Sequence, residues 1–409
     1  MRTPEQHRDE VAAKLNQRST ARFALADAVG LTLAETITAQ HDSPRFDNSQ
    51  MDGYALGESH VNNPGIFETG ATLAAGTDPA DYYPNGIKST IVPIMTGARI
   101  PDGTAAIVPV EACDPHEFVA AGDAVSIPPV NAGQFIRRAG SDITAGAELL
   151  KEGTVLTPAA IATLASQSIH EVTCVKPSRI VICTGGKEIS GPDSTGPGDD
   201  AATIPDSNGP MLRAQAARYG IEVAASIRTD DDPEALRADF QRAIDEHQPD
   251  AIITSGGISH GKFEVIRQVL EADGWFGHVD QQPGGPQGIS SFSGVPVICL
   301  PGNPVSTLVS FRLFVAPLLG TAPAGFPLTG ADALTTPIKA TVDRVFTGLP
   351  GRDQFLRGTY ALTDGHVTAT PLGGAGSHLI SQAAEATALI RIPADKPINV
   401  GESVDVYPL

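Results

Sequence analysis

Basic residues and long apolar runs are both scarce in this chain of 409 residues. Lysine and arginine number 28 against 47 acidic residues, so the formal net charge is −19. This balance argues against non-specific binding to nucleic acid or to an anionic membrane, because both need basic patches. It leaves room for a small anionic ligand, since a local group of arginines and loop amides can act against the global charge.

Cysteine is also scarce, and its spacing excludes two further classes. The four cysteines lie far apart, without a C-x-x-C pair or a histidine at the spacing of a zinc site. No run of about 18 apolar residues is present to span a membrane, and residues 1–9 lack the apolar core of a signal peptide. We therefore expect a cytoplasmic protein with reduced thiols. Its length predicts two to four domains.

The pattern of apolar residues changes along the chain. Residues 4–17 and 24–37 are expected to form helices, and residues 156–166 a third that starts with proline. Residues 66–129 consist of short apolar runs broken by Gly, Pro and Asn, which predicts a small β-rich domain. After about residue 326, short alternating runs predict a second domain of strands.

Strands and helices alternate in the middle of the chain. Residues 179–183, 250–254 and 295–300 are typical of buried strands, and helices are expected at 233–246 and 262–272. This alternation predicts a doubly wound parallel sheet. Each strand ends in a polar loop that contains glycine. Because ligands bind at the carboxyl ends of such strands, and glycine amides can donate to phosphate, we expect these loops to line a nucleotide or pterin pocket.

An acidic block lies at residues 46–55, with the sequence FDNSQMDGYA. Asp47 and Asp52 are oxygen ligands of the kind that Mg²⁺ prefers. Asn48 and Ser49 can bond to their own backbone and make the turn rigid. On the residues alone, a plain polar surface turn is the commoner outcome for such a block.

Seven motifs together resemble one family, the molybdopterin molybdenumtransferases (the MoeA family, related to the E domain of gephyrin). They occur in the order of that family and span nearly the whole chain. The motifs are FDNSQMDGYA (46–55), MTGA (95–98), RRAGSDI (137–143), SGGISHG (255–261), LPGNPVS (300–306), GRDQF (351–355) and GSHLI (376–380).

The resemblance implies a multidomain α/β protein. Residues 1–45 with 145–177 would form a helical linker and dimerisation region, and residues 46–144 an inserted β-rich domain. Residues 178–326 would form a doubly wound, molybdopterin-binding domain, and residues 327–409 a C-terminal β-barrel-like domain. The implied enzyme is a Mg²⁺-dependent transferase of molybdenum cofactor biosynthesis, which inserts molybdate into adenylated molybdopterin and releases AMP. A homodimer and a molybdopterin adenylyltransferase partner are implied as well.

The resemblance also assigns roles to individual residues. Asp52, Asp142 and Glu264 would bind the metal and act in catalysis, together with Thr96. Arg352 and Ser377 match the family's site for the molybdate oxyanion, and an arginine fork suits such a group. For the hydroxyls of Thr96 and Ser259, service in a turn is equally plausible on chemistry alone. The cofactor-binding set is Ser255, Gly256, Gly257, Ser259, Gly261, Asp206, Pro301, Gly302, Asn303, Pro304, Arg352 and Ser377.

Three departures from the family pattern stand out. The family's Lys-Pro-Gly-Lys-Pro segment has Gln282 and Gly285 in place of its two lysines. The family's Thr-Gly-Asp-Glu-Leu loop lacks its aspartate here and carries Lys187, which could return one positive charge. Glu264 stands where the family more often has aspartate. Two alternatives therefore stay open: a non-catalytic paralogue that binds or carries molybdopterin or its cofactor, and a hydrolase acting on another pyrophosphate.

Overall fold

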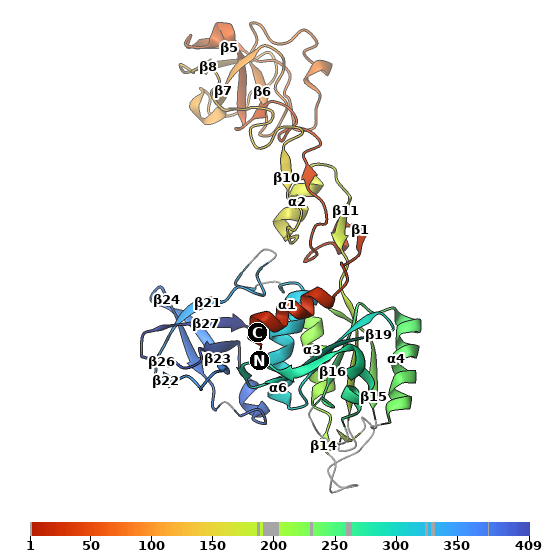
Figure 1. Cartoon of the computed structure of the whole chain (residues 1–409). Helices are drawn as coiled ribbons and strands as arrows, with labels where there is room; N and C mark the ends of the chain where they lie inside the picture. Colours follow the sequence, from red (N-terminus) through yellow and green to blue (C-terminus); the bar gives the residue numbers. More distant parts are fainter. Residues whose placement is uncertain are drawn as a thin grey trace. The chain divides into compact units, whose positions relative to one another are not determined.

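The computed structural model divides into two compact units (Figure 1). The larger unit comprises Met1–Ala34, Gly153–Thr157 and Glu171–Leu409, and the smaller comprises Glu35–Glu152 and Pro158–His170. None of the described helices has the length and apolarity needed to cross a membrane. The four-part division expected from the sequence stays a prediction. The structure describes residues 2–185, 189–190, 204–229, 232–258, 264–323, 326–328, 332–374 and 376–409.

A six-stranded sheet in the order β15-β12-β16-β20-β19-β17 forms the centre of the larger unit. The first four strands are parallel, which confirms the predicted doubly wound arrangement. The antiparallel strands β19 and β17 were not predicted. A turn with positive φ at Ser293 and Gly294 lets β19 reverse into β20. The strands are β12 (Arg179–Gly185), β15 (Glu222–Thr229), β16 (Ala251–Ser255), β17 (Trp275–His278), β19 (Pro286–Phe292) and β20 (Val295–Leu300).

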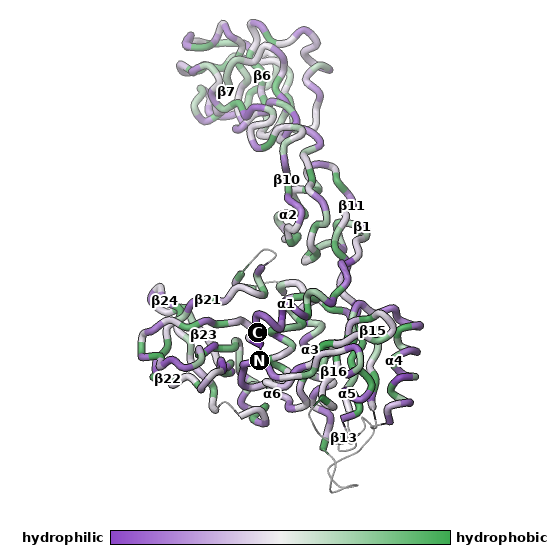
Figure 2. Tube along the Cα trace, in the orientation of Figure 1, coloured by the Kyte–Doolittle hydropathy of each residue, from purple (hydrophilic) through white to green (hydrophobic). Residues whose placement is uncertain are grey.

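Apolar clusters on both faces of this sheet explain its buried strands. Along β12, Ile180 and Ile182 pack into one cluster, whereas Val181 and Cys183 pack into the other. This alternation follows the two-residue period of a strand. Helix α3 (Asn208–Arg218) covers the first face, and α4 (Pro233–His247) with α5 (Val265–Leu270) covers the second. In Figure 2 the tube is hydrophobic along β16 and of mixed hydropathy along α4.

Five strands near the C-terminus close into a barrel. They follow one another in the order β23-β24-β21-β27-β25, and β25 pairs back with β23. The short strand β18 (Gln281–Gln282) comes from the preceding domain and adds to β23 in parallel. The barrel strands are β21 (Ile338–Val342), β23 (Asp353–Thr363), β24 (His366–Pro371), β25 (Ala388–Ile392) and β27 (Ser403–Pro408).

One predicted helix near the N-terminus is wrong. The helix α1 (Pro4–Lys14) forms, with a capping box at Thr3, but residues 24–37 form no helix beyond a single 3-10 turn at Leu25–Asp27. That segment begins with the end of β1 (Thr20–Ala24), which pairs with β11 (Glu171–Val175), and Leu33 bridges to Cys174 in the same strand. Pairing between residues far apart in sequence has overridden a weak helical pattern.

The smaller unit is rich in strands, as the sequence predicts. Its three-stranded sheet has the order β6-β4-β7. Three further strand pairs are β5 with β8, β3 with β9, and β2 (Ile37–Thr38) with β10 (Glu148–Leu150). The β3–β9 pair places Asn48 opposite Arg137 and so joins two of the motifs. Its elements include β3 (Asn48–Ser49), β4 (Gly53–Gly57), β5 (Gly65–Glu68), β6 (Val92–Ile94), β7 (Thr104–Pro109), β8 (Ala124–Ile127), β9 (Ile136–Arg137) and α2 (Pro158–Ser166).

Candidate functional site

Two adjoining cavities in the larger unit form the candidate site. The first, which we call the loop cavity, has a volume of about 410 Å³ and is lined by the end of β12 and by the loops that follow β16 and β20. The two loops that the structure describes therefore meet the end of β12 at one edge of the sheet. From the expected binding set, its lining includes Ser255, Gly256, Gly257, Asp206, Pro301, Gly302, Asn303, Pro304 and also Glu264. Ser259, Gly261 and Lys187 lie outside the described residues.

Asp206 ties helix α3 to the end of β12. Its Oδ1 accepts hydrogen bonds of 3.0 Å from the amides of Asn208 and Gly209, and its Oδ2 accepts one of 2.9 Å from the Thr184 hydroxyl. The Asn208 side chain in turn donates to the carbonyl of Gly302 at 2.7 Å. Both carboxylate oxygens of Asp206 therefore accept hydrogen bonds from within the protein. In this structure Asp206 shapes the loop cavity from within.

Close packing of two loops explains why each carries glycine. A Cβ added to Gly302 would lie 3.2 Å from the Cα of Gly256. Gly256 and its neighbour Gly257 also have positive φ, of 96° and 66°. The Ser255 hydroxyl is buried and bonds to the Pro301 carbonyl at 3.1 Å. Ser255 therefore fixes this pair of loops, and the amide of Gly256 joins them further by donating to the Leu300 carbonyl at 3.1 Å.

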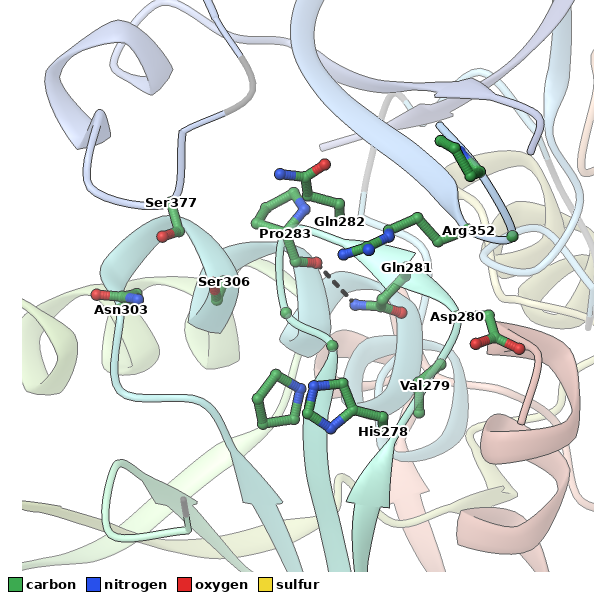
Figure 3. Close-up of a pocket in the computed structure, with 15 residues that line it drawn as sticks. His278, Val279, Asp280, Gln281, Gln282, Pro283, Asn303, Ser306, Arg352 and Ser377 are labelled. Carbon is green, nitrogen blue, oxygen red and sulfur yellow. Dashed lines mark hydrogen bonds between the residues drawn. The ribbon is translucent and has the colours of Figure 1, made fainter. Parts of the chain in front are cut away.

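The second cavity, which we call the oxyanion cavity, also has a volume of about 410 Å³ (Figure 3). Its lining contains both Arg352 and Ser377, as the resemblance implied. It also contains Gln282 and Gly285, the two positions where the family's lysines are missing. The Arg352 side chain extends toward the β18 segment in Figure 3. Pro286, Asn303 and Ser306 line both cavities, so the two adjoin at the start of α6 (Pro304–Ser310). The remaining polar lining includes His278, Asp280, Gln281 and Gln282.

Arg357 supports the loop that presents Ser377. Its side chain is fully buried in β23, and it donates to the carbonyls of Gly374 at 2.6 Å and Gly376 at 3.5 Å. The carbonyl of Ser377 then accepts from the amide of Val305 at 3.2 Å, which joins this loop to α6. The sequence reading missed Arg357. The sequence feature that could have identified it is an arginine at an inward position of a strand, where a charged side chain is rare unless it has a structural or functional role.

An ion-pair network holds the segment that carries Arg352. Asp353 pairs with Arg391, whose guanidinium also reaches Glu5 of α1 at 2.6 Å. Burial lowers the pKa of Arg391, but the Asp353 and Glu5 carboxylates outweigh it, so the pKa of Arg391 is raised overall. The amide of Asp353 also donates to the carbonyl of Asp280 at 3.0 Å. These bonds fix the edge of the barrel against the segment before β18.

In the smaller unit, Asp52 and Thr96 contact each other directly. The Oδ1 of Asp52 accepts from the Thr96 amide at 2.6 Å and from the Thr96 hydroxyl at 2.7 Å. These two bonds hold the pKa of Asp52 below its ordinary value. The carboxylate is exposed and ionised at neutral pH, as a metal ligand must be.

The other acidic residues of the smaller unit differ in their partners. Asp47 pairs with Arg138 at 2.5 Å and accepts from the Ala139 amide at 2.7 Å. Burial raises the pKa of Asp47, but the Ala139 amide and Arg138 lower it overall. Asp142 is exposed, and its amide donates to the Ser43 carbonyl at 2.9 Å. Asp52 and Asp142 are therefore more open to a cation than Asp47.

The turn of the acidic block has the side-chain bonds that the sequence predicts. Asn48 donates to the Phe46 carbonyl at 3.2 Å, and the Ser49 hydroxyl donates to the Met51 carbonyl at 2.6 Å.

Within the described part of the chain, no three His, Cys, Asp or Glu side chains gather as a cluster able to hold a metal ion.

These features define a class: a multidomain α/β protein with a polar cavity at the edge of a doubly wound sheet. Three family models match it, namely "MoeA N-terminal region (domain I and II)" over residues 2–168, "Probable molybdopterin binding domain" over 180–321 and "MoeA C-terminal region (domain IV)" over 339–409. The chain belongs to the MoeA family of molybdopterin molybdenumtransferases.

Individual relatives agree over the full length. The chain is 33% identical to molybdopterin molybdenumtransferase 2 of Mycobacterium tuberculosis, with 100% of both chains covered. It is 30% identical to molybdopterin molybdenumtransferase of Staphylococcus aureus, with 99% of this chain and 96% of the relative covered. A solved structure of the molybdopterin biosynthesis MoeA protein from Pyrococcus horikoshii superposes with a TM-score of 0.77 at 25% identity, over 99% and 98% of the two chains.

Proposed function

We propose that this chain is a molybdopterin molybdenumtransferase, which inserts molybdate into molybdopterin during molybdenum cofactor biosynthesis. The observation that carries the proposal is the junction of the loop cavity and the oxyanion cavity at Asn303 and Ser306. An insertion reaction needs a pterin and an oxyanion in contact, and holding both in adjoining cavities makes their encounter intramolecular.

Each cavity suits one of the two substrates. In the loop cavity, the amide of Gly257 can donate to the phosphate of the pterin, because the residue has no side chain to keep it away. The amide of Gly256 instead donates to the Leu300 carbonyl at 3.1 Å. In the oxyanion cavity, Arg352 would bind molybdate through its guanidinium fork and Ser377 through its hydroxyl. Asn303 would contact both ligands, since it lines both cavities.

We further propose that the pterin arrives adenylated, that AMP is released, and that Mg²⁺ takes part. The bound ion would neutralise charge on the phosphates that separate. Asp52 and Asp142 of the smaller unit, and Glu264 of the larger unit, are each proposed as a magnesium ligand. A site for Mg²⁺ often needs only one or two carboxylates, because substrate oxygens and water complete its six ligands. The ionised, exposed carboxylate of Asp52 suits this arrangement, and Thr96 would orient it.

Family membership also supports a homodimer and contact with a molybdopterin adenylyltransferase. Light scattering of the purified protein would test the first. Direct transfer of adenylated molybdopterin between the two enzymes, measured in the presence of a trap for free substrate, would test the second.

The experiment for the main proposal measures AMP release from adenylated molybdopterin by the purified protein. Release should need both Mg²⁺ and micromolar molybdate, and Asp52→Ala should abolish it. Release that is independent of molybdate would indicate a pyrophosphate hydrolase. Tight binding without release under any condition would indicate a carrier paralogue, which the loss of lysines at Gln282 and Gly285 favours.

A further inference from the structure

The fixed charges of the oxyanion cavity nearly cancel. Arg352 contributes one positive charge, whereas Asp280 contributes one negative charge to the same lining. A dianion such as molybdate would therefore meet little net attraction from these two groups. Of the described residues that line the cavity, the only other one that can become positively charged is His278.

The imidazole of His278 lies beside a position where a lysine is missing. A Cβ added to Gly285 would lie 3.3 Å from Cδ2 of the His278 ring. The antiparallel pairing of β17 with β19 sets this neighbourhood, because it places His278 opposite Pro286. A longer side chain at residue 285 would have to compete with the ring for space.

The backbone does not require glycine at residue 285. Gly284 has a φ of 90°, in the left-handed region that favours glycine, but Gly285 does not have such a φ. Packing around Gly285 is also open apart from His278, since the next atoms are carbonyl oxygens 3.6 Å away. The missing side chain at this position is therefore explained by the neighbouring ring and not by conformation.

We propose that protonated His278 is the second cation of the oxyanion cavity and takes the place of the missing lysines, with the Gln282 amide as a neutral donor. This inference rests on the proposed function, since it takes molybdate as the ligand of this cavity. Binding of the dianion would then draw one proton from solvent onto His278. The affinity for molybdate should fall as the pH rises, because an imidazole changes its charge between about pH 5 and pH 8.

The charged neighbours of His278 come from three segments. Asp280 follows it on the same segment, and Arg352 comes from the turn before β23. Arg2 donates from its backbone amide to the His278 carbonyl at 3.4 Å, and its guanidinium lies over the Trp275 ring, 3.9 Å from the centroid. The remaining lining from α6 and from the Ser377 loop is neutral.

The test is titration calorimetry of molybdate into the full-length protein at about pH 6 and about pH 8. The wild type should bind about tenfold more tightly at the lower pH, the usual size of a hydrogen bond to a charged group. His278→Gln should lose that advantage and show the same affinity at both pH values. His278→Lys should bind at both pH values as tightly as the wild type does at the lower one. His366→Gln, an exposed histidine of β24, is the matched control and should keep the wild-type profile.

A charge swap keeps the proposal testable if a single variant folds poorly. In the double variant His278→Ala/Gly285→Lys, the lysine takes the space of the ring and restores a permanent charge, so tight binding without pH dependence is expected. If the wild type binds no molybdate at either pH, the proposed role of this cavity fails. If the wild type binds molybdate but His278→Gln keeps its affinity and its pH dependence, the inference about His278 is overturned and the proposed function stands.

Discussion

His7 of α1 is a buried histidine whose surroundings make a quantitative prediction. Its side chain is fully buried between Phe314, edge-on at 4.7 Å, and Trp275, tilted at 5.4 Å between ring centroids. Neither ring nitrogen has a hydrogen-bond partner among the described residues. Burial, with a smaller contribution from Arg2, lowers the pKa of His7 from 6.5 to about 3.

This shift makes the folded state sensitive to acid. Because the pKa of His7 is lower in the folded state, the unfolded chain binds the proton first as the pH falls below 6.5. The contribution to stability is therefore complete above about pH 6.5 and is lost progressively down to about pH 3. Each pH unit in this window removes about 1.4 kcal/mol, so the free energy of unfolding should fall by about 2 kcal/mol by about pH 5.

A variant isolates this contribution from other groups that titrate in the same range. His7→Phe keeps an aromatic ring against Phe314 and Trp275 but carries no proton, and replacing an unpaired buried polar group by an apolar one can be neutral or stabilising. Urea unfolding followed by fluorescence suits the question, because Trp275 is the only tryptophan in the chain and touches His7. Between about pH 7.5 and about pH 5, the variant should lose about 2 kcal/mol less than the wild type. An equal loss in both proteins would refute the reasoning.

Four further substitutions test the site and the fold. Asp52→Asn should lower molybdate-dependent AMP release at least about tenfold without changing the melting temperature, because the amide is a poor metal ligand; Thr96→Val should give a smaller loss. Asp206→Ala removes the cap of α3 and should cost about 1 kcal/mol in thermal unfolding while weakening pterin binding in calorimetry. Gly53→Ala should destabilise the smaller unit by about 3 kcal/mol or more in chemical denaturation, because the added Cβ would lie 2.0 Å from the Val108 carbonyl oxygen.

Local patterns predicted much of the larger unit. The strand β20 lies where its apolar run placed it, and α4 begins at Pro233 as expected, with Asp232 accepting from the amides of Glu234 and Ala235. Such features depend on neighbouring residues alone. The loop cavity could be predicted for the same reason, because the ends of parallel strands must meet at one edge.

Features that depend on distant pairing were not predicted in this way. The segment at 24–37 forms no helix because Leu33 bridges to Cys174, far along the chain. The barrel closes through pairing of β23 with β25, which no local pattern encodes. His278 and Asp280 reach the oxyanion cavity only because β18 leaves the doubly wound domain and pairs with β23.

The geometry around residue 285 changes what the two missing lysines imply. Read along the sequence, Gln282 and Gly285 are losses of charge that favour a carrier without activity. In the structure the same cavity keeps Arg352 and Ser377 and places His278 where a side chain at residue 285 would otherwise lie. A permanently charged side chain and a titratable side chain then differ in a measurable way, because only the titratable one makes molybdate binding depend on pH. The pH profile of molybdate affinity therefore distinguishes a cavity that no longer binds an oxyanion from one that binds it through His278 in place of the missing lysines.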